Sequence, residues 1–368
     1  MPNNIPDSLQ LRIDQLIITA DDATKVGQPN EGLNASIQAF ELAESQQYPE
    51  GMGNALLAKG RALVELVRLD EAMAVLNQAA TLFQENGHAL GIARALQGIG
   101  TIHHLSGRFL DALEEYHNAF SVFELAGLEM HTLGVLGNIS LVYKTLGEYF
   151  FSIEYARKRL TLAKEYRKDS DILKALDSLG VTYFQLSDFE TSLEYSNEGL
   201  TLAIQSANPE AESEFLFNIG IIYYHLHNST TALDYAMRSM AIVEQLKLER
   251  LLAVKYNFIC NIYLKMNNDA LALHYAMRAL ELNTEYGNPL GEADTLHNIA
   301  SIFEHNGDYA TALEYGLRSY GFYTTASVKE CESQSLLLIA RCKKHLNDPT
   351  AVASAREALA IAKSIHSH

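Results

Sequence analysis

The chain has 368 residues, 48% of them hydrophobic, and a formal net charge of −17. Nucleic acids and anionic membranes attract proteins with an excess of Lys and Arg, so this charge argues against both as partners. The length also exceeds the roughly 250–300 residues that one compact core organises, whereas repeats that pack only on their neighbours escape that limit.

The sequence shows no targeting signal and no cysteine motif. The first residues lack a basic stretch followed by an apolar run, and no run of about 18 apolar residues occurs, so we expect a cytoplasmic protein. Cys331 and Cys342 fall in one predicted helix, roughly 16 Å apart and beyond disulfide reach. With Cys260 they form no Cys-x-x-Cys pair. We expect three free thiols and no metal site.

Residues 1–47 are predicted to form a degenerate first helical unit. The segment Asn30-Glu31-Gly32-Leu33 aligns with Asp70-Glu71-Ala72-Met73, one repeat later. An atypical unit at the end of a repeat array can cap its open face.

Residues 48–328 are predicted to form seven regular repeats of about 40 residues each, a period typical of repeat architectures. A small residue recurs at the same register, with a large residue four positions before it and, in most repeats, an aromatic residue three positions after it. This spacing follows one stripe of a helix and lets a neighbouring helix approach closely. The small positions are Gly60, Gly100, Ser140, Gly180, Gly220, Cys260 and Ala300, and Ala340 continues the series.

A second series with the same period predicts a second helix in each repeat. It consists of tyrosines, one in each of five consecutive repeats, which are Tyr155, Tyr195, Tyr235, Tyr275 and Tyr315. Gly107 and Gly147 lie between the two series, and Gly commonly supplies the left-handed residue that ends a helix. Each repeat is therefore predicted to be a helix A, a tight turn and a helix B.

Residues 329–368 are predicted to form a divergent last unit, in which Asp348-Pro349-Thr350 begins the final helix. The whole chain is then a single array of about nine antiparallel helix pairs without a separate domain. The predicted fold class is all-α.

The pattern resembles the tetratricopeptide repeat. The large, small and aromatic positions of that family's helix A are present in Leu176-Asp177-Ser178-Leu179-Gly180-Val181-Thr182-Tyr183, and Ala232, Ala236 and Ser239 match the small residues of its helix B. The unit has about 40 residues, more than the roughly 34 of the common repeat. Units of this length resemble those of kinesin light chains, LGN-type adaptors and bacterial signalling arrays. The resemblance implies a right-handed α-solenoid, or superhelix, whose inner groove is lined by the A helices.

The resemblance also implies that a bound peptide would lie in this groove. Carried over by register, the candidate peptide-binding residues are Asn138, Lys144, Lys174, Phe217, Asn218, Tyr224, Asn257, Asn261 and Asn298.

Three of these candidates, Asn138, Asn218 and Asn298, occur in every second repeat, each two positions before the small residue. An amide both donates and accepts, so it can pair with the backbone of an extended peptide. The alternative is that each Asn bonds to a helix of the neighbouring repeat, and its burial and bonding distinguish the two.

Cations and aromatic residues leave similar alternatives open. Lys144 and Lys174, with Arg61, Arg94 and Lys265, would make the groove less acidic and suit an acidic peptide or a terminal carboxylate; otherwise they are solvated helix charges. Phe217 and Tyr224, with Phe184 and Ile221, either form a hydrophobic anchor pocket or pack on the next repeat.

No catalytic or cofactor motif occurs. The sequence lacks a Gly-rich phosphate loop, a Gly-x-Ser-x-Gly elbow and a His-Glu-x-x-His pair. We therefore expect no cofactor, no metal and no enzymatic activity, and the sequence predicts a scaffold that binds another protein or an extended peptide.

The main alternative is the N-terminal sensory or dimerisation module of a bacterial signalling protein. Its output domain, a nucleotide cyclase, a kinase or a transcription regulator, would lie outside this chain. A peptide-pheromone regulator of the Rap type is disfavoured, because residues 1–47 look too short for its N-terminal helical bundle. A homodimer is compatible with these alternatives.

Overall fold

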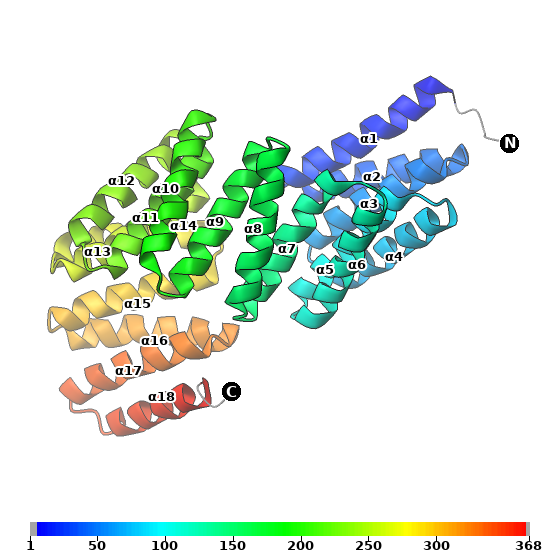
Figure 1. Cartoon of the computed structure of the whole chain (residues 1–368). Helices are drawn as coiled ribbons and strands as arrows, with labels where there is room; N and C mark the ends of the chain where they lie inside the picture. The colour runs from blue at the N-terminus through cyan, green and yellow to red at the C-terminus, as the bar shows by residue number, and fades with distance from the viewer. Residues whose placement is uncertain (1–5, 366–368) are drawn as a thin grey trace. The chain divides into compact units, whose positions relative to one another are not determined.

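The computed structural model describes residues 6–365, in which all secondary structure is helical (Figure 1). The chain divides into two compact units, Met1–Asp188 and Phe189–His368. The first contains α1 (Asp7–Lys25), α2 (Pro29–Ser45), α3 (Pro49–Glu65), α4 (Leu69–Glu85), α5 (Ala89–Leu105), α6 (Phe109–Leu125), the 3-10 helix η1 (Glu129–His131), α7 (Thr132–Thr145), α8 (Tyr149–Glu165) and α9 (Asp169–Gln185). The second contains α10 (Phe189–Gln205), α11 (Pro209–His225), α12 (Ser229–Gln245), α13 (Glu249–Lys265), α14 (Asp269–Glu285), α15 (Pro289–His305), α16 (Tyr309–Ala326), α17 (Lys329–His345) and α18 (Ala351–Ile365).

Within each unit, consecutive helices pack against one another, which confirms the predicted all-α class. The odd-numbered helices are the predicted A helices, and the even-numbered ones are the B helices. The division into caps at 1–47 and 329–368 around seven repeats at 48–328 stays a prediction. Residues 1–5 and 366–368 of those caps lie outside the described part of the chain.

Most helices have the same length and end in the same way. The helices α3, α4 and α5, for example, are each 17 residues long. A residue with positive φ follows each helix by two positions in most turns, and it recurs at every twentieth position from Gly27 to Asn347. Glycine occupies several of these positions, but Val67 and Arg167 also adopt φ values of 58° and 52°. Both turns of a repeat therefore have the same geometry, and each repeat consists of two halves of equal length.

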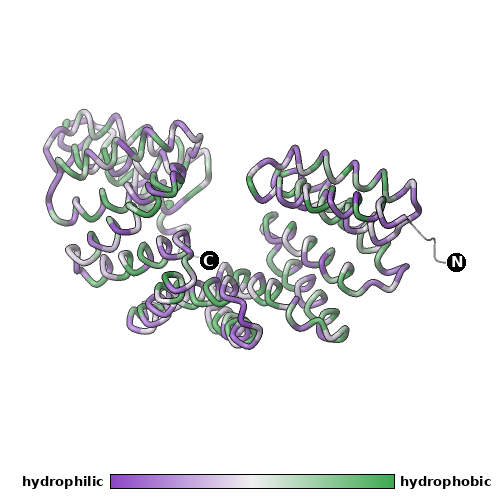
Figure 2. Tube along the Cα trace, turned by 90° about the horizontal axis from the view of Figure 1, so that it is seen from above, coloured by the Kyte–Doolittle hydropathy of each residue, from purple (hydrophilic) through white to green (hydrophobic). Residues whose placement is uncertain are grey.

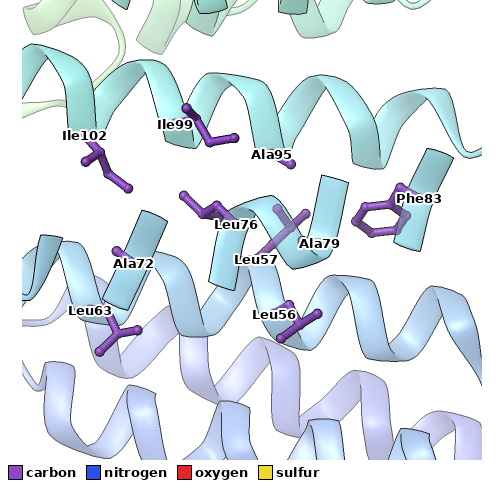
Figure 3. Close-up of a cluster of buried hydrophobic side chains, with 10 residues drawn as sticks. All are labelled: Leu56, Leu57, Leu63, Ala72, Leu76, Ala79, Phe83, Ala95, Ile99 and Ile102. Carbon is purple, nitrogen blue, oxygen red and sulfur yellow. The ribbon is translucent and has the colours of Figure 1, made fainter. Parts of the chain in front are cut away.

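The core lies between the helices of each unit, where small residues face large ones. Figure 2 shows hydrophobic and hydrophilic residues alternating along the helices, as expected when one side of each helix is buried. One cluster gathers side chains from α3, α4 and α5 (Figure 3). A Cβ on Gly53 or Gly91 would lie 2.4 Å from the ring of Phe83, and a Cβ on Gly60 would lie 2.6 Å from Leu76. These glycines admit the large side chains of α4.

The tyrosine series joins the two helices of single repeats. Tyr223 of α11 stacks on Tyr235 of α12, with ring centroids 5.7 Å apart and planes 12° apart. Equivalent stacks join Tyr143 to Tyr155, Tyr263 to Tyr275, and Phe303 to Tyr315. All these rings are half-buried, so this series has a structural role.

Candidate functional site

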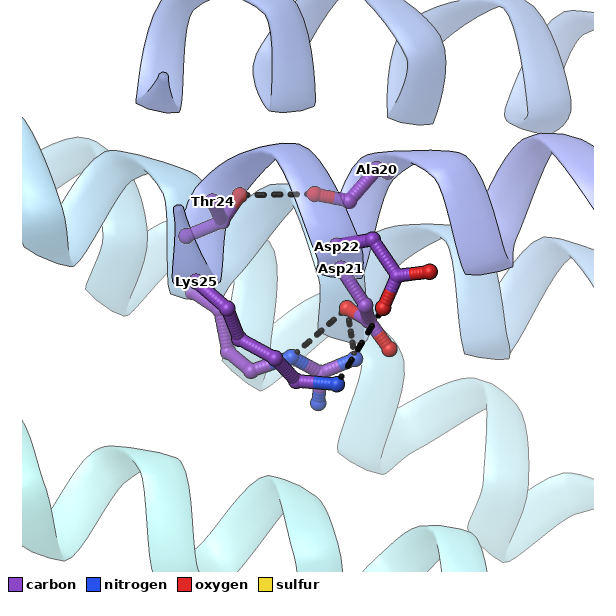
Figure 4. A network of polar contacts seen from close by, with 6 residues as sticks. Ala20, Asp21, Asp22, Thr24 and Lys25 are labelled. Atoms are coloured by element: carbon purple, nitrogen blue, oxygen red, sulfur yellow. Dashed lines mark hydrogen bonds and ion pairs between the residues drawn. The ribbon is translucent and has the colours of Figure 1, made fainter. Parts of the chain in front are cut away.

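The predicted binding residues lie on the A helices, and we call the exposed side of α1, α3, α5, α7 and α9 the helix-A face of the first unit. Its N-terminal part contains an ion pair between consecutive A helices. Arg61 of α3 donates two hydrogen bonds to Asp21 Oδ1 of α1, at 3.0 and 2.6 Å. Asp22 and Lys25 lie beside this pair (Figure 4), joined by an ion pair of 3.5 Å.

A pocket of about 330 Å³ adjoins this ion pair, between α1, α3 and α5. Gly60 and Gly98 line it next to Leu76, whose side chain a Cβ on either glycine would meet. Arg94 also lines the pocket and forms no hydrogen bond or ion pair with any described residue. Its pKa is lowered, first by desolvation and second by Arg61. Arg94 therefore brings a positive charge to the pocket that no described residue balances by direct contact.

The three predicted residues of the first unit lie further along the same face. Asn138 and Lys144 of α7 are half-buried, and Lys174 of α9 is exposed. None of the three forms a hydrogen bond or an ion pair within residues 6–365. The amide of Asn138 and both ammonium groups remain available to an external partner.

The helix-A face of the second unit, on α11, α13, α15 and α17, places Phe217 and Tyr224 against the next repeat. Both rings meet Phe258 of α13 edge-on, with centroids 5.2 and 5.7 Å away. Lys255 covers the Phe217 ring, and Lys265 covers the Tyr224 ring while donating to the Tyr224 carbonyl at 2.8 Å. These contacts correspond to packing on the next repeat.

The asparagines of the second unit differ in their bonding. Asn257 Oδ1 accepts a hydrogen bond of 2.9 Å from the hydroxyl of Thr295, so this Asn joins α13 to α15. Asn261 and Asn298 are half-buried and form no hydrogen bond with any described residue. Asn218 is also half-buried, and it differs from Asn261 and Asn298 because it does have an interaction partner.

Several polar contacts between consecutive A helices were not predicted from the sequence. Lys255 is the most buried of these residues and bonds to Glu214 at 3.1 Å. Arg341 forms a two-pronged ion pair with Glu304, with bonds of 2.6 and 2.7 Å. Each pair spans about one repeat, 37 to 41 residues. A search for opposite charges at this spacing would have found them.

His297 of α15 lies next to the candidate Asn298 but is not itself among the predicted binding residues. Its Nδ1 lies 3.2 Å from the hydroxyl of Ser335 on α17. The pKa of His297 is lowered, first by burial and then by Arg341. A neutral imidazole in this position joins two A helices.

The described residues provide no group of three or more His, Cys, Asp or Glu that could hold a metal ion. Cys260, Cys331 and Cys342 are free, as predicted, and burial raises the pKa of the Cys260 thiol to about 12. None of the helices between residues 6 and 365 combines the length and apolar character needed to cross a membrane.

The comparisons with known proteins agree with this architecture. The family model described as Tetratricopeptide repeat matches residues 251–325, which cover most of α13 to α16. No curated protein sequence matches the chain. The helix pairs and this match define a helical repeat protein of the tetratricopeptide type.

Solved structures of low sequence identity share the fold. The apo form of RapI has a TM-score of 0.72 and 15% identity, covering 98% of this chain and 99% of that chain. The apo quorum sensor NprR from B. thuringiensis has a TM-score of 0.67 and 15% identity, covering 96% and 99%. PH0952 from Pyrococcus horikoshii, a signal transduction ATPase (STAND) with a tetratricopeptide repeat sensor, has a TM-score of 0.68 and 13% identity, covering 94% of this chain and 52% of that one.

The likeness to RapI corrects one expectation. Residues 1–47 looked too short for a protein of the Rap type, but the match extends over 98% of this chain and 99% of RapI. The expectation that residues 1–47 are too short for a protein of the Rap type is therefore wrong. At 15% identity the likeness concerns the fold alone.

Proposed function

We propose that this protein binds a peptide, or an extended segment of another protein, on the helix-A faces of its units and catalyses no reaction itself. The observation that carries the proposal is how hydrogen-bond partners are distributed on these faces. Arg61, Lys255 and Lys265 each bond to the preceding A helix. A second set has no such partner among the described residues, and it consists of Arg94, Asn138, Lys144, Lys174, Asn261 and Asn298.

Polar groups of this second set suit a peptide backbone. The amides of Asn138 and Asn298 can each donate to a carbonyl and accept from an N–H group of an extended peptide. Both project from α-helices, so the backbone that carries them is already ordered before a peptide binds. Because neither amide has an intramolecular bond to break, each bond to a peptide replaces only contacts with water and contributes a net of about 0.5–1.5 kcal/mol.

Two kinds of structure with this fold carry peptides. A Rap protein has been solved with Competence and Sporulation Factor, and NprR with its cognate peptide NprX. These ligands belong to those proteins. They support the proposal because they show that helical arrays of this fold accommodate peptides.

An acidic group on the peptide is the finer part of the proposal. Arg94 lacks an ion-pair partner beside a 330 Å³ pocket, and Lys144 and Lys174 lie further along the same face. A carboxylate can accept two parallel hydrogen bonds from a guanidinium group, which makes Arg94 the expected contact. The ligand is then a peptide with an acidic side chain or a free C-terminal carboxylate.

The test starts from a library of short peptides with free C-termini, selected on the full chain. Fluorescence anisotropy then measures the affinity of the selected peptide for the wild type, Asn138→Ala, Asn298→Ala and Arg94→Ala. The variants of the unit that holds the selected peptide, Asn138→Ala and Arg94→Ala in the first or Asn298→Ala in the second, should each weaken binding about tenfold, with the melting temperature nearly unchanged.

Asn118→Ala is the matched control, because Asn118 is an exposed asparagine of α6, a B helix. Affinities that stay unchanged in all three helix-A variants would contradict the proposed site. If Asn138→Ala weakens binding and Arg94→Ala, in the same unit, does not, the acidic part of the proposal is wrong and the peptide-binding part stands.

A sensory module of a larger signalling protein is the second candidate function. It is favoured by the match to PH0952, whose tetratricopeptide sensor accompanies an ATPase and of which this chain covers 52%. An immunoblot of the native host distinguishes the two. A band well above 40.8 kDa, the mass of this chain, would support the module, and a band at that mass would contradict it.

A further inference from the structure

A second surface of the first unit, formed largely by the B helices α6 and α8, has a local irregularity at its centre. The neighbouring A helices α5 and α9 each have 17 residues, but α7 has only 14. Its expected first turn is the 3-10 helix η1, which ends where Thr132 donates to the Glu129 carbonyl at 2.7 Å. The α-helical geometry of this A helix therefore begins three residues later than in α5 and α9.

A pocket of about 1070 Å³ lies at this irregularity, between α6, η1, α7 and α8. It shares no residue with the binding candidates of the helix-A face. Its apolar lining consists of Phe120, Leu136, Phe150, Ile153 and Leu162. Such a volume exceeds most sites for small ligands and is large enough for several side chains of a partner protein.

Phe150 is the exposed anchor of this pocket. It is 76% exposed, and its ring packs edge-to-face on Phe151, which is itself 41% exposed. An aromatic side chain this exposed contributes almost nothing to the core. Aromatic residues that become buried only on association often carry much of the binding energy of an interface.

The charged residues that line the pocket carry a net negative charge. Lys158 is paired with Glu154 at 2.6 Å, whereas Arg157 donates to the neutral Tyr183 hydroxyl at 2.7 Å and keeps its charge. Glu124 and Glu165 form no hydrogen bond or ion pair with any described residue.

A fourth carboxylate, Glu129, accepts only a weak contact of 3.2 Å from the Tyr166 hydroxyl. The four carboxylates of the lining outnumber its two cations, so an incoming molecule meets a net negative charge. This charge repels anionic lipids and nucleic acids and attracts Lys and Arg.

We propose that this pocket is a docking site for an amphipathic helix of a partner protein that carries Lys or Arg beside its apolar face. The apolar face would cover Phe150 and enter the pocket, and the cations would pair with Glu124 and Glu165. This mode of recognition, an amphipathic helix in an apolar groove, needs both features together. The site is separate from the helix-A face and does not depend on the function proposed for it.

The test uses a fluorescein-labelled amphipathic peptide of Leu and Lys and an otherwise identical peptide of Leu and Glu. The Leu–Lys peptide should bind the full chain, and the Leu–Glu peptide should bind at least about tenfold more weakly. Phe150→Ser and the double variant Glu124→Gln/Glu165→Gln should each weaken binding of the Leu–Lys peptide about tenfold.

Matched controls separate the pocket from the general negative charge of the protein. Leu110→Ser changes a side chain that is 75% exposed and lies one repeat before Phe150. Glu85→Gln/Glu114→Gln removes two exposed carboxylates outside the pocket. Both controls should bind like the wild type within about twofold.

The proposal fails if the control double variant weakens binding as much as the pocket double variant, because net charge alone would then explain the attraction. It also fails if Phe150→Ser and Leu110→Ser bind alike. Phe150 and both glutamates are exposed, so circular dichroism should show unchanged helix content for all variants.

Discussion

The ammonium group of Lys255 lies 3.6 Å from the centre of the Phe217 ring, and only 2% of the lysine is exposed. Glu214 supplies an ion pair at 3.1 Å but is itself half exposed. Burial lowers the pKa of Lys255, although Glu214 opposes this shift. The contacts of α11 therefore compensate the burial of this charge only in part.

Replacing Lys255 and replacing Glu214 should have opposite effects on the free energy of unfolding. Lys255→Met should leave the free energy of unfolding unchanged or raise it by up to about 2 kcal/mol, because an apolar side chain replaces a buried charge. Glu214→Gln should lower it by about 1–3 kcal/mol, because the ammonium loses its partner. Urea unfolding followed by circular dichroism measures both. Equal losses in the two variants would contradict this account.

The lowered pKa of Lys255 also predicts a dependence of stability on pH. Well below the folded-state pKa the lysine is charged in both states, and the folded state bears the cost of burying the charge. As the pH rises through the folded-state pKa toward the ordinary value of 10.5, the folded protein releases the proton first and this cost disappears. The wild type should therefore gain stability relative to Lys255→Met as the pH rises toward 10.5. A constant difference would show that the pKa is not lowered.

Gly→Ala substitutions should change the free energy of unfolding in opposite directions at glycines that face a large side chain and at a glycine with open space around it. At Gly53 or Gly91 the new Cβ would lie 2.4 Å from the Phe83 ring, so we expect a net loss of about 1–3 kcal/mol. At Gly321 of α16 no atom lies within 4 Å of the new Cβ. Gly321→Ala should raise stability by about 0.5–1 kcal/mol through helix propensity alone. Thermal unfolding of the three variants checks this, and a stabilised Gly53→Ala would refute the packing argument.

The turns predict a reciprocal pair of substitutions. Val67 adopts φ of 58°, which is unfavourable for a β-branched residue. Val67→Gly should raise the free energy of unfolding by up to about 1 kcal/mol, and Gly107→Val should lower it by about 1–2 kcal/mol. A Cβ on Gly107 meets nothing within 4 Å, so the second effect reports backbone conformation alone. Urea midpoints that shift in the same direction for both variants would contradict the shared turn geometry.

His297 predicts a loss of stability in acid. Its pKa lies below the ordinary 6.5, first because of burial and second because of Arg341, while Asp294 and Glu304 act in the opposite direction. The unfolded chain therefore takes up the proton first as the pH falls from about 7 toward 5, and the folded state loses stability. His297→Asn should lose less stability over this range than the wild type. Thermal unfolding across it makes the comparison, and parallel curves for the two proteins would exclude a contribution from His297.

Much of the fold could be predicted because the period of the repeat is a local pattern. Small residues such as Gly60 and Gly100 recur with large neighbours at helical spacing, and the helices form where that spacing places them. The turns were predicted less completely. Residues such as Gly107 and Gly147 marked several of them, but Val67 and Arg167 hold the same left-handed conformation without any residue preference to reveal it. There the packing of the two flanking helices on one another holds the conformation.

The sequence predicted the positions of the candidate site, but it could not predict which hydrogen bonds each residue forms. Asn257 and Asn298 look alike in the sequence, yet Asn257 bonds to Thr295 and Asn298 has no bond within the described residues. Phe217 was an anchor candidate, and in the structure Lys255 covers its ring.

The sequence by itself determined the helices, their repeat and the small positions of the core, because these follow from residues a few positions apart. Only the tertiary structure decided which polar groups are engaged and which residues line the pocket beside η1. Those partners come from other helices, often 37 to 41 residues away, and depend on the reach of each side chain.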